Sequence, residues 1–131
     1  MSTDSIGDFL TIIRNGIMAS KRFVSAPYSN MRFELARILK EEGFIKDAVV
    51  EDLGITKKTI KIFLKYVDSE SVIHEITRIS TPGKRRYNGV AEIKPVIGGL
   101  GVTILTTSQG ILTNKKAKQL SIGGEVICTV W

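Results

Sequence analysis

The chain has 131 residues, of which 43% are hydrophobic and 24% are charged. These proportions are those of an ordinary globular protein, so they exclude an extensively disordered chain and leave room for one compact unit or two small lobes. The 19 lysines and arginines outnumber the 13 aspartates and glutamates, and the formal net charge of +6 favours a polyanionic partner, with nucleic acid ahead of a membrane surface.

Two amphipathic helices are predicted near the start of the chain. Apolar residues recur at helical spacing over residues 4–20, namely Ile6, Leu10, Ile13 and Ile17. Thr3 or Asp4 can cap that helix. A second helix is expected over Asn30–Glu42, because Ser29 can cap its start and Gly43 suits a left-handed residue at its end. Pro27 keeps the connection between the two helices extended.

A β-hairpin is predicted after the helices. The runs Phe44–Glu51 and Thr59–Tyr66 are rich in β-forming residues, and Gly54 lies in the segment that joins them. A short polar segment, Asp68–Ser71, follows the hairpin. We place a boundary there between an N-terminal α/β lobe, residues 1–67, and a C-terminal, mainly β lobe, residues 68–131.

Strands dominate the rest of the chain. We predict strands over Val72–Ser80, Val102–Thr107 and Val126–Trp131, a basic turn over Thr81–Arg86, and a short helix over Asn114–Leu120. Helices first and strands later predict an α+β fold of two small lobes, with helices and a hairpin in the first and one short helix in the second.

The two lobes carry similar net charge, but within the second lobe the positive charge is concentrated after its first residues. From Ile76 to Trp131, eight basic residues face only Glu92 and Glu125, so this segment accounts for the whole net charge. The basic residues are Arg78, Lys84, Arg85, Arg86, Lys94, Lys115, Lys116 and Lys118. A solvated basic surface is the ordinary explanation of such a cluster, so a binding function needs further sequence signals.

The first such signal is the turn Ser80, Thr81, Pro82, Gly83. A Pro-Gly pair fits a type II turn, which would present Lys84, Arg85 and Arg86 as a tight group of cations. Tyr87 follows directly, and a tyrosine beside cations can stack on an unpaired base of RNA. The alternative is that Tyr87 begins a strand and packs into the core.

The second signal is a cluster of hydroxyls at the end of a predicted strand. Thr106, Thr107 and Ser108 precede Gly110, where the backbone can come close to a ligand, and the hydroxyls could contact base edges or 2′-hydroxyls. The hydroxyls of a polar turn more often hydrogen-bond only to the backbone of that turn, and a purely structural role is therefore the alternative here.

Signatures of catalysis and of metal binding are missing from the sequence. It has no P-loop and no G-x-S-x-G elbow, and its single Cys128 and single His74 do not suit a nucleophile and base or a zinc site. We expect Cys128 to be a small core residue and His74 to be structural or exposed. No apolar run approaches the length of a membrane span, and Asp4 and Asp8 do not suit a secretory signal, so the expected location is the cytoplasm.

Several of these motifs, taken in order, resemble a known family. Ser80–Tyr87, Gly99–Gly101, Thr106–Gly110 with Ala117, and Gly123–Trp131 are similar to motifs of bacterial ribosomal small-subunit protein eight. The opening of the chain agrees with that family in nine residues, Thr3, Asp4, Ile6, Asp8, Leu10, Thr11, Ile13, Arg14 and Asn15, and Leu39–Ile45 follows its Leu-Lys-x-Glu-Gly-[Phe/Tyr]-Ile pattern. The resemblance covers essentially the whole chain.

The resemblance implies a structural protein that binds the central domain of small-subunit rRNA early in assembly and, in some bacteria, represses its own messenger. The family's Ser-Thr-Ser-x-Gly loop corresponds to Thr106, Thr107, Ser108 and Gly110, with a threonine in place of the first serine. Asn114 stands where the family usually has aspartate, Tyr87 matches an RNA-facing tyrosine, and Glu125 matches the acidic residue after a Gly-Gly turn. The expected RNA-binding residues are Ser80, Thr81, Pro82, Gly83, Lys84, Arg85, Arg86, Tyr87, Thr106, Thr107, Ser108, Gly110, Lys115, Gly124 and Glu125, with Asn30, Lys57 and Lys58 as supporting contacts from the first lobe.

The expected partners are small-subunit rRNA and neighbouring small-subunit proteins in the cytoplasmic ribosome. We expect no cofactor, metal, catalytic residue, membrane contact or small-molecule substrate. Two other classes stay open at this point. An RNA-modifying enzyme would lose activity but keep RNA affinity when His74 or a specific carboxylate is replaced, and a protein-interaction adaptor would bind its partner whether or not RNA is present.

Overall fold

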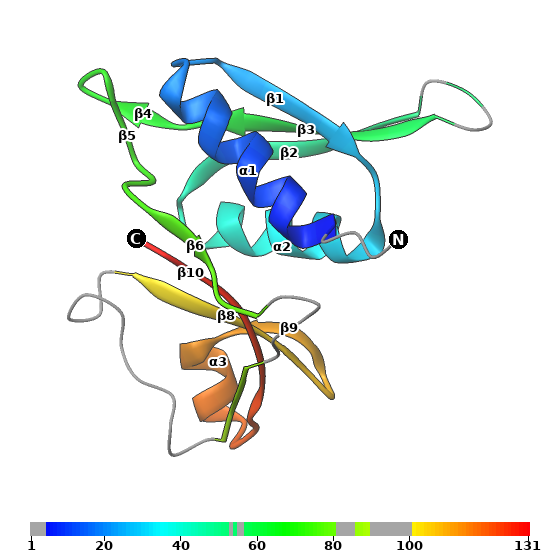
Figure 1. The fold of residues 1–131 in the computed structure, drawn as a ribbon, viewed down its shortest axis with the longest axis vertical. Helices are drawn as coiled ribbons and strands as arrows, with labels where there is room; N and C mark the ends of the chain where they lie inside the picture. Colours follow the sequence, from blue (N-terminus) through cyan, green and yellow to red (C-terminus); the bar gives the residue numbers. More distant parts are fainter. Residues whose placement is uncertain (1–4, 53, 55–56, 81–85, 90–100) are drawn as a thin grey trace. The chain divides into compact units, whose positions relative to one another are not determined.

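The computed structural model describes residues 5–52, 54, 57–80, 86–89 and 101–131 and has the α+β fold predicted from the sequence (Figure 1). Its contacts divide the chain into two compact units. Residues 8–73 form the N-terminal lobe, and residues 74–131 with residues 1–7 form the C-terminal lobe. The division falls after Ile73, whereas the polar segment Asp68–Ser71 placed it a little earlier.

The N-terminal lobe combines two helices with a three-stranded antiparallel sheet. In chain order its elements are α1 (Ser5–Met18), apart from the first three residues of that helix, β1 (Phe23–Pro27), α2 (Asn30–Glu41), β2 (Ile45–Asp52) and β3 (Lys58–Leu64). The strand order is β1-β3-β2, so β3 is central. The buried side chains of β3 are Ile60, Ile62 and Leu64, on alternate residues as a sheet with one covered face requires. Phe9, Leu10 and Ile13 of α1 and Leu35 and Leu39 of α2 are also fully buried.

The two predicted helices and the predicted hairpin are confirmed. The Ser29 hydroxyl caps α2 by accepting a hydrogen bond from Arg32 N at 3.1 Å, and Gly43 has the left-handed φ of +82° expected after the helix. Strands β2 and β3 pair antiparallel on either side of Gly54. The connection that contains Pro27 is extended, as predicted, and residues 23–27 of it also form the edge strand β1. Pro27 is the last residue of this strand, where its missing N–H removes no hydrogen bond that the sheet needs.

The polar segment after β3 is a second, shorter hairpin. Strands β4 (Tyr66–Val67) and β5 (Glu70–Ser71) pair antiparallel, and Asp68 and Ser69 form the turn with positive φ of 53° and 65°. Positive φ at both central residues is the geometry of the two-residue hairpin turns that match strand twist.

The C-terminal lobe is built around its last strand. Strand β10 (Gly124–Val130) pairs along one edge with β6 (Ile76–Arg78) and β7 (Tyr87–Asn88), and along the other with β8 (Val102–Thr107), which in turn pairs with β9 (Gly110–Thr113). Helix α3 (Asn114–Gln119) lies against β8 and β9 (Figure 1). Leu105, Ala117 and Val126 form a buried cluster beneath it, with Ile79 and Leu112 packed around them.

The prediction of a strand over Val72–Ser80 is wrong for most of that range, because only Ile76–Arg78 is a strand. The residues before it hydrogen-bond to Ser71 and to Trp131 without forming a regular ladder. Ile73 N donates to the Ser71 hydroxyl at 3.2 Å, and the amides of His74 and Glu75 both donate to the carbonyl of Trp131. High β propensity therefore did not extend the pairing.

Cys128 lies fully buried in the central strand, as expected of a small core residue. Burial disfavours the thiolate and raises the pKa of the thiol from its ordinary 9.0 to about 12. In the unfolded chain the thiol loses its proton at a lower pH than in the folded protein, so Cys128 stabilises the fold below pH 9 and loses this contribution as the pH rises toward 12.

We expect this loss to reach about 1.4 kcal/mol per pH unit in the free energy of unfolding. Urea denaturation at several alkaline pH values measures it. The comparison protein is Cys128→Ala, whose unfolding free energy lacks the thiol contribution, so the difference between the two curves isolates Cys128. Parallel pH profiles for the two proteins would contradict the burial of this thiol.

Candidate nucleic-acid interface

Three of the expected RNA-binding residues lie side by side across three strands of the C-terminal sheet. Glu125 of β10 is in register with Tyr87 of β7 on one side and with Thr106 of β8 on the other. Register partners project from the same face, so the ring, the carboxylate and the hydroxyl form one row. The side chain of Tyr87 is 66% exposed. Tyr87 thus begins a strand, as one interpretation held, but it does not pack into the core.

The neighbouring candidates project from the opposite face of the same end of the sheet. Thr107 is two residues beyond the buried Leu105, and Gly124 is two residues before the buried Val126, so both belong to the face that α3 covers. A Cβ on Gly124 would collide with the backbone carbonyl oxygen of Thr106 and lie 2.9 Å from Thr107 Cγ2. Close packing of β10 on β8 therefore requires glycine at this position.

The hydroxyl loop is a tight hairpin turn between β8 and β9. Thr107 Oγ1 donates to the carbonyl of Gly110 at 2.8 Å and accepts from the amide of Gln109 at 3.1 Å, so this hydroxyl satisfies its own turn. Gly110 has φ +100°, which a side chain would strain. Ser108 at the tip is exposed. The structural interpretation of the cluster therefore holds for Thr107, and Ser108 is the hydroxyl that faces outward.

This arrangement predicts different effects for two substitutions that the sequence alone does not distinguish. Thr107→Ala should lower the free energy of unfolding by about 1 kcal/mol through the lost turn bonds, with little effect on the RNA affinity of the folded protein. Ser108→Ala should leave stability unchanged and weaken RNA binding by a similar amount. Chemical denaturation and RNA titration of both variants measure this. The reverse assignment of the two effects would contradict it.

Ser80 is fully buried, which is not the position of a direct RNA contact. Its hydroxyl accepts from the amide of Arg86 at 2.7 Å and donates to the carbonyl of Arg86 at 3.2 Å. The carbonyl of Arg86 also accepts from Val126 N at 2.8 Å. Ser80 and Arg86 are thus bonded to each other, and both are bonded to Val126 of β10. Thr81, Pro82, Gly83, Lys84 and Arg85 lie outside the described residues, and Arg86 is exposed.

The hydrogen bonds at the start of α3 explain why the uncharged Asn114 suits this position. Thr113 caps the helix by accepting from Lys116 N at 3.2 Å, and the buried Asn114 accepts from the amide of Thr103 at 3.2 Å. A neutral amide makes this buried bond without placing an unpaired charge in the core. Lys115 follows on the exposed side of the helix, with Lys116 and Lys118.

The candidates in the N-terminal lobe are joined by a residue that sequence reasoning missed. Tyr28 donates from its hydroxyl to Asn30 Oδ1 at 2.8 Å, and Lys58 Nζ lies 4.6 Å from the centre of the Tyr28 ring. Lys57 and Lys58 line an adjacent hollow of about 280 Å³. The Tyr28 patch, meaning Tyr28, Asn30, Lys57 and Lys58, thus presents cations and an aromatic ring together. The only sequence signal for Tyr28 was an aromatic residue just before a helix cap.

No group of three or more His, Cys, Asp or Glu side chains among the described residues converges as metal ligands would. Among the same residues, no helix has the length and apolarity that crossing a membrane requires.

Comparison with known proteins gives a consistent match along the chain. A family model described as ribosomal protein S8 matches residues 4–131. Curated relatives named small ribosomal subunit protein uS8 include one from Koribacter versatilis, 48% identical over 133 residues and covering 100% of this chain and 98% of the relative. The relative from Mycoplasma capricolum is 50% identical over 131 residues and covers 100% of both chains. The relative from Halothermothrix orenii is 51% identical over 133 residues, covering 98% of each.

Proposed function

The chain belongs to the ribosomal protein S8 family, and from this membership we propose that it is a structural constituent of the small ribosomal subunit. It binds the central domain of small-subunit rRNA directly and helps that domain assemble, in the cytoplasmic ribosome and beside other small-subunit proteins. The observation that carries the proposal is the family match over residues 4–131. Its role is to bind and position RNA, and no reaction is assigned to it.

The geometry of the C-terminal lobe supports an RNA-binding surface at the end of its sheet. The exposed ring of Tyr87 offers a stacking surface, and Thr106 and Ser108 offer hydroxyls that both donate and accept hydrogen bonds. Glu125 accepts from the amino groups of exposed bases. Lys115 and the basic turn Lys84–Arg86 contribute phosphate contacts, which position the protein without reading sequence.

The Tyr28 patch supports a second, weaker contact from the N-terminal lobe. Lys57 and Lys58 supply positive charge that suits a phosphate backbone. Because Lys58 Nζ already lies over the Tyr28 ring, this patch contributes phosphate contacts rather than base stacking. Binding by two separate surfaces would tie together two parts of one folded RNA, which is a physical route to assisting assembly.

Hydroxyl-radical footprinting of the full chain on its own small-subunit rRNA tests this function. We expect one strongly protected site within the central domain, because base and hydroxyl contacts discriminate between sites whereas phosphate contacts do not. Large-subunit rRNA at equal mass serves as the control for binding by charge alone. Protection of many scattered sites, or equal competition by the control RNA, would show that the protein is only a basic surface and would contradict the proposal.

A further inference from the structure

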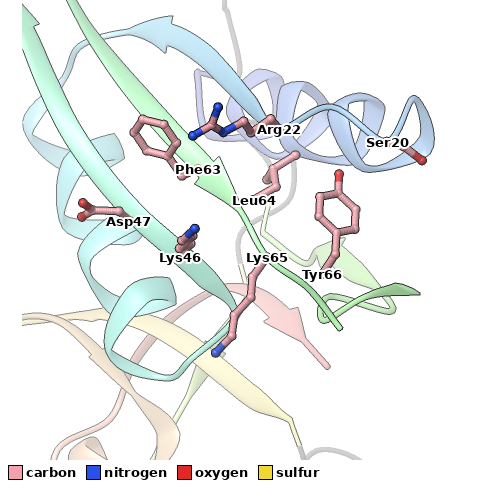
Figure 2. Close-up of a pocket in the computed structure, with 8 residues that line it drawn as sticks. All are labelled: Ser20, Arg22, Lys46, Asp47, Phe63, Leu64, Lys65 and Tyr66. Atoms are coloured by element: carbon pink, nitrogen blue, oxygen red, sulfur yellow. The ribbon is translucent and has the colours of Figure 1, made fainter. Parts of the chain in front are cut away.

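A groove on the N-terminal lobe is not used by the proposed RNA contacts. It has a volume of about 840 Å³ and lies where β1 begins and β3 ends (Figure 2). Its walls include Arg22, Lys46, Phe63, Leu64, Lys65 and Tyr66. The Tyr28 patch follows the other end of β1, since Phe23 pairs with Phe63 whereas Pro27 pairs with Thr59. A ligand in the groove therefore leaves that patch accessible.

Local structure shapes the groove and fixes its walls. The register of β2 against β3 shifts between Ile45 and Asp47, so Lys46 is the extra residue of a β-bulge. Bulges bend a strand and redirect a side chain, and this one adds a cation to the groove wall. The Tyr66 hydroxyl donates to the carbonyl of Lys21 at 2.7 Å, which holds its ring in place as the opposite wall.

The groove carries an excess of positive charge. Among the described residues that line it, the one carboxylate is that of Asp47, which lies 3.0 Å from Lys40 Nζ and also accepts from Ala48 N at 2.8 Å. The bonds to Lys40 and Ala48 lower the pKa of Asp47, so it stays ionised and balances Lys40. Within the described part of the chain no carboxylate pairs with Arg22 or Lys46, whose charges are left for a ligand.

The sheet face next to the groove carries exposed apolar side chains among polar and charged ones. Phe23, Phe63 and Val49 project from the outer face of the sheet, with Phe23 41% and Val49 37% exposed. The two rings pack with their centres 5.9 Å apart. Lys61 Nζ lies 4.0 Å from the centre of the Phe23 ring and 5.5 Å from that of Phe63, where a nucleobase would have to stack.

We propose that this groove is a docking site for an acidic segment of a protein partner, with an apolar side chain anchored against the rings of Phe63 and Tyr66 and carboxylates paired with Arg22 and Lys46. Partly exposed aromatic rings beside cations that no described carboxylate pairs with complement such a segment. RNA suits it less, because Lys61 already covers the ring faces that bases would use. The proposal goes beyond rRNA binding and does not depend on it.

The test uses synthetic acidic peptides of equal charge that differ only in a central residue, which is Leu, Ile, Phe, Trp or Ser, together with oligouridylate. Binding to the full chain is followed by fluorescence anisotropy and by the amide resonances of Arg22, Lys46 and Leu64. The groove variant is Arg22→Glu with Lys46→Glu. The matched control is Lys116→Glu with Lys118→Glu, which changes the net charge equally on exposed positions of the other lobe.

We expect the peptides with an apolar centre to shift the groove amides and to bind more tightly than the serine peptide. The groove variant should lose about tenfold in peptide affinity, whereas the control should stay within about twofold. The affinity of the groove variant for the rRNA site should match that of the parent protein, which keeps this test separate from the proposed function. The proposal is overturned if no acidic peptide shifts the groove amides, if oligouridylate shifts them instead, or if both variants lose peptide affinity equally. Thermal melting of each variant establishes that it is folded.

Discussion

Replacing Gly124 with alanine is expected to destabilise the C-terminal lobe by about 3 kcal/mol, the upper end of the usual cost of overpacking. The added Cβ would collide with the backbone carbonyl oxygen of Thr106, and a backbone atom in a paired strand cannot move aside without breaking its ladder. Glu125 is the next residue, so the same distortion moves the row of Tyr87, Glu125 and Thr106. We therefore expect rRNA affinity to fall together with stability.

A double substitution identifies the cause of this effect. Thr107→Ala removes the methyl group that lies 2.9 Å from the new Cβ but leaves the carbonyl of Thr106 in place. Adding it to Gly124→Ala should therefore not restore the free energy of unfolding, which chemical denaturation measures. Recovery of stability in the double variant would locate the conflict at the flexible side chain, and the assignment to the backbone would be wrong.

Replacing Tyr87 with alanine is expected to have the largest effect on rRNA affinity without loss of stability. The side chain is 66% exposed, so its removal leaves no cavity. Stacking of a base on an aromatic ring is worth about 1 to 3 kcal/mol, and titration of the rRNA site should show a reduction of that size. Tyr87→Phe keeps the ring and should retain most of the affinity.

The salt dependence of binding separates this stacking interaction from a charge effect. Tyr87→Ala removes no cation, so the slope of log affinity against log salt should match that of the parent protein. Neutralising Lys84, Arg85 and Arg86 is the comparison, since it should flatten the slope by up to about 0.9 for each phosphate that the protein no longer neutralises. An unchanged affinity in Tyr87→Ala would remove the ring from the interface.

Local signals in the sequence located the helices and the longest strands. Ser29 and Gly43 delimit α2 because capping and a left-handed stop are decided by a few neighbouring residues. The strand Val102–Thr107 was predicted with its observed bounds, because an apolar run ending in a hydroxyl cluster is also a local signal. The α+β fold class followed from the order of these elements.

Short strands, and strands whose extent depends on their pairing partners, were missed or misjudged. The short strands β7 and β9 have two and four residues, too few for periodicity to reveal, and each forms because a neighbouring strand offers an edge. The run after Val72 has the composition of a strand, yet its amides bond to Ser71 and Trp131 instead. Pairing partners decide such cases, and they are set by the tertiary fold.

The candidate site was predicted as a set of motifs but not as a surface. Alternation along β8 sends Thr106 and Thr107 to opposite faces, which depends on the sheet around them. The hydroxyls of Ser80 and Thr107 are used inside the protein, and a sequence does not distinguish such hydroxyls from those that face a ligand. Tyr28 entered the site only through its interactions with Asn30 and Lys58.

The central position of β10 has a consequence for folding during protein synthesis. The strands β6, β7 and β8 all pair with β10, although each is synthesised before it. The facing edges of β6 and β8 therefore have no partner in this sheet until residues 124–130 have been made, and unpaired edges invite association with other chains. The N-terminal sheet needs only residues up to Leu64 and can form earlier. A nascent chain thus passes through a stage with one folded lobe and one lobe vulnerable to aggregation.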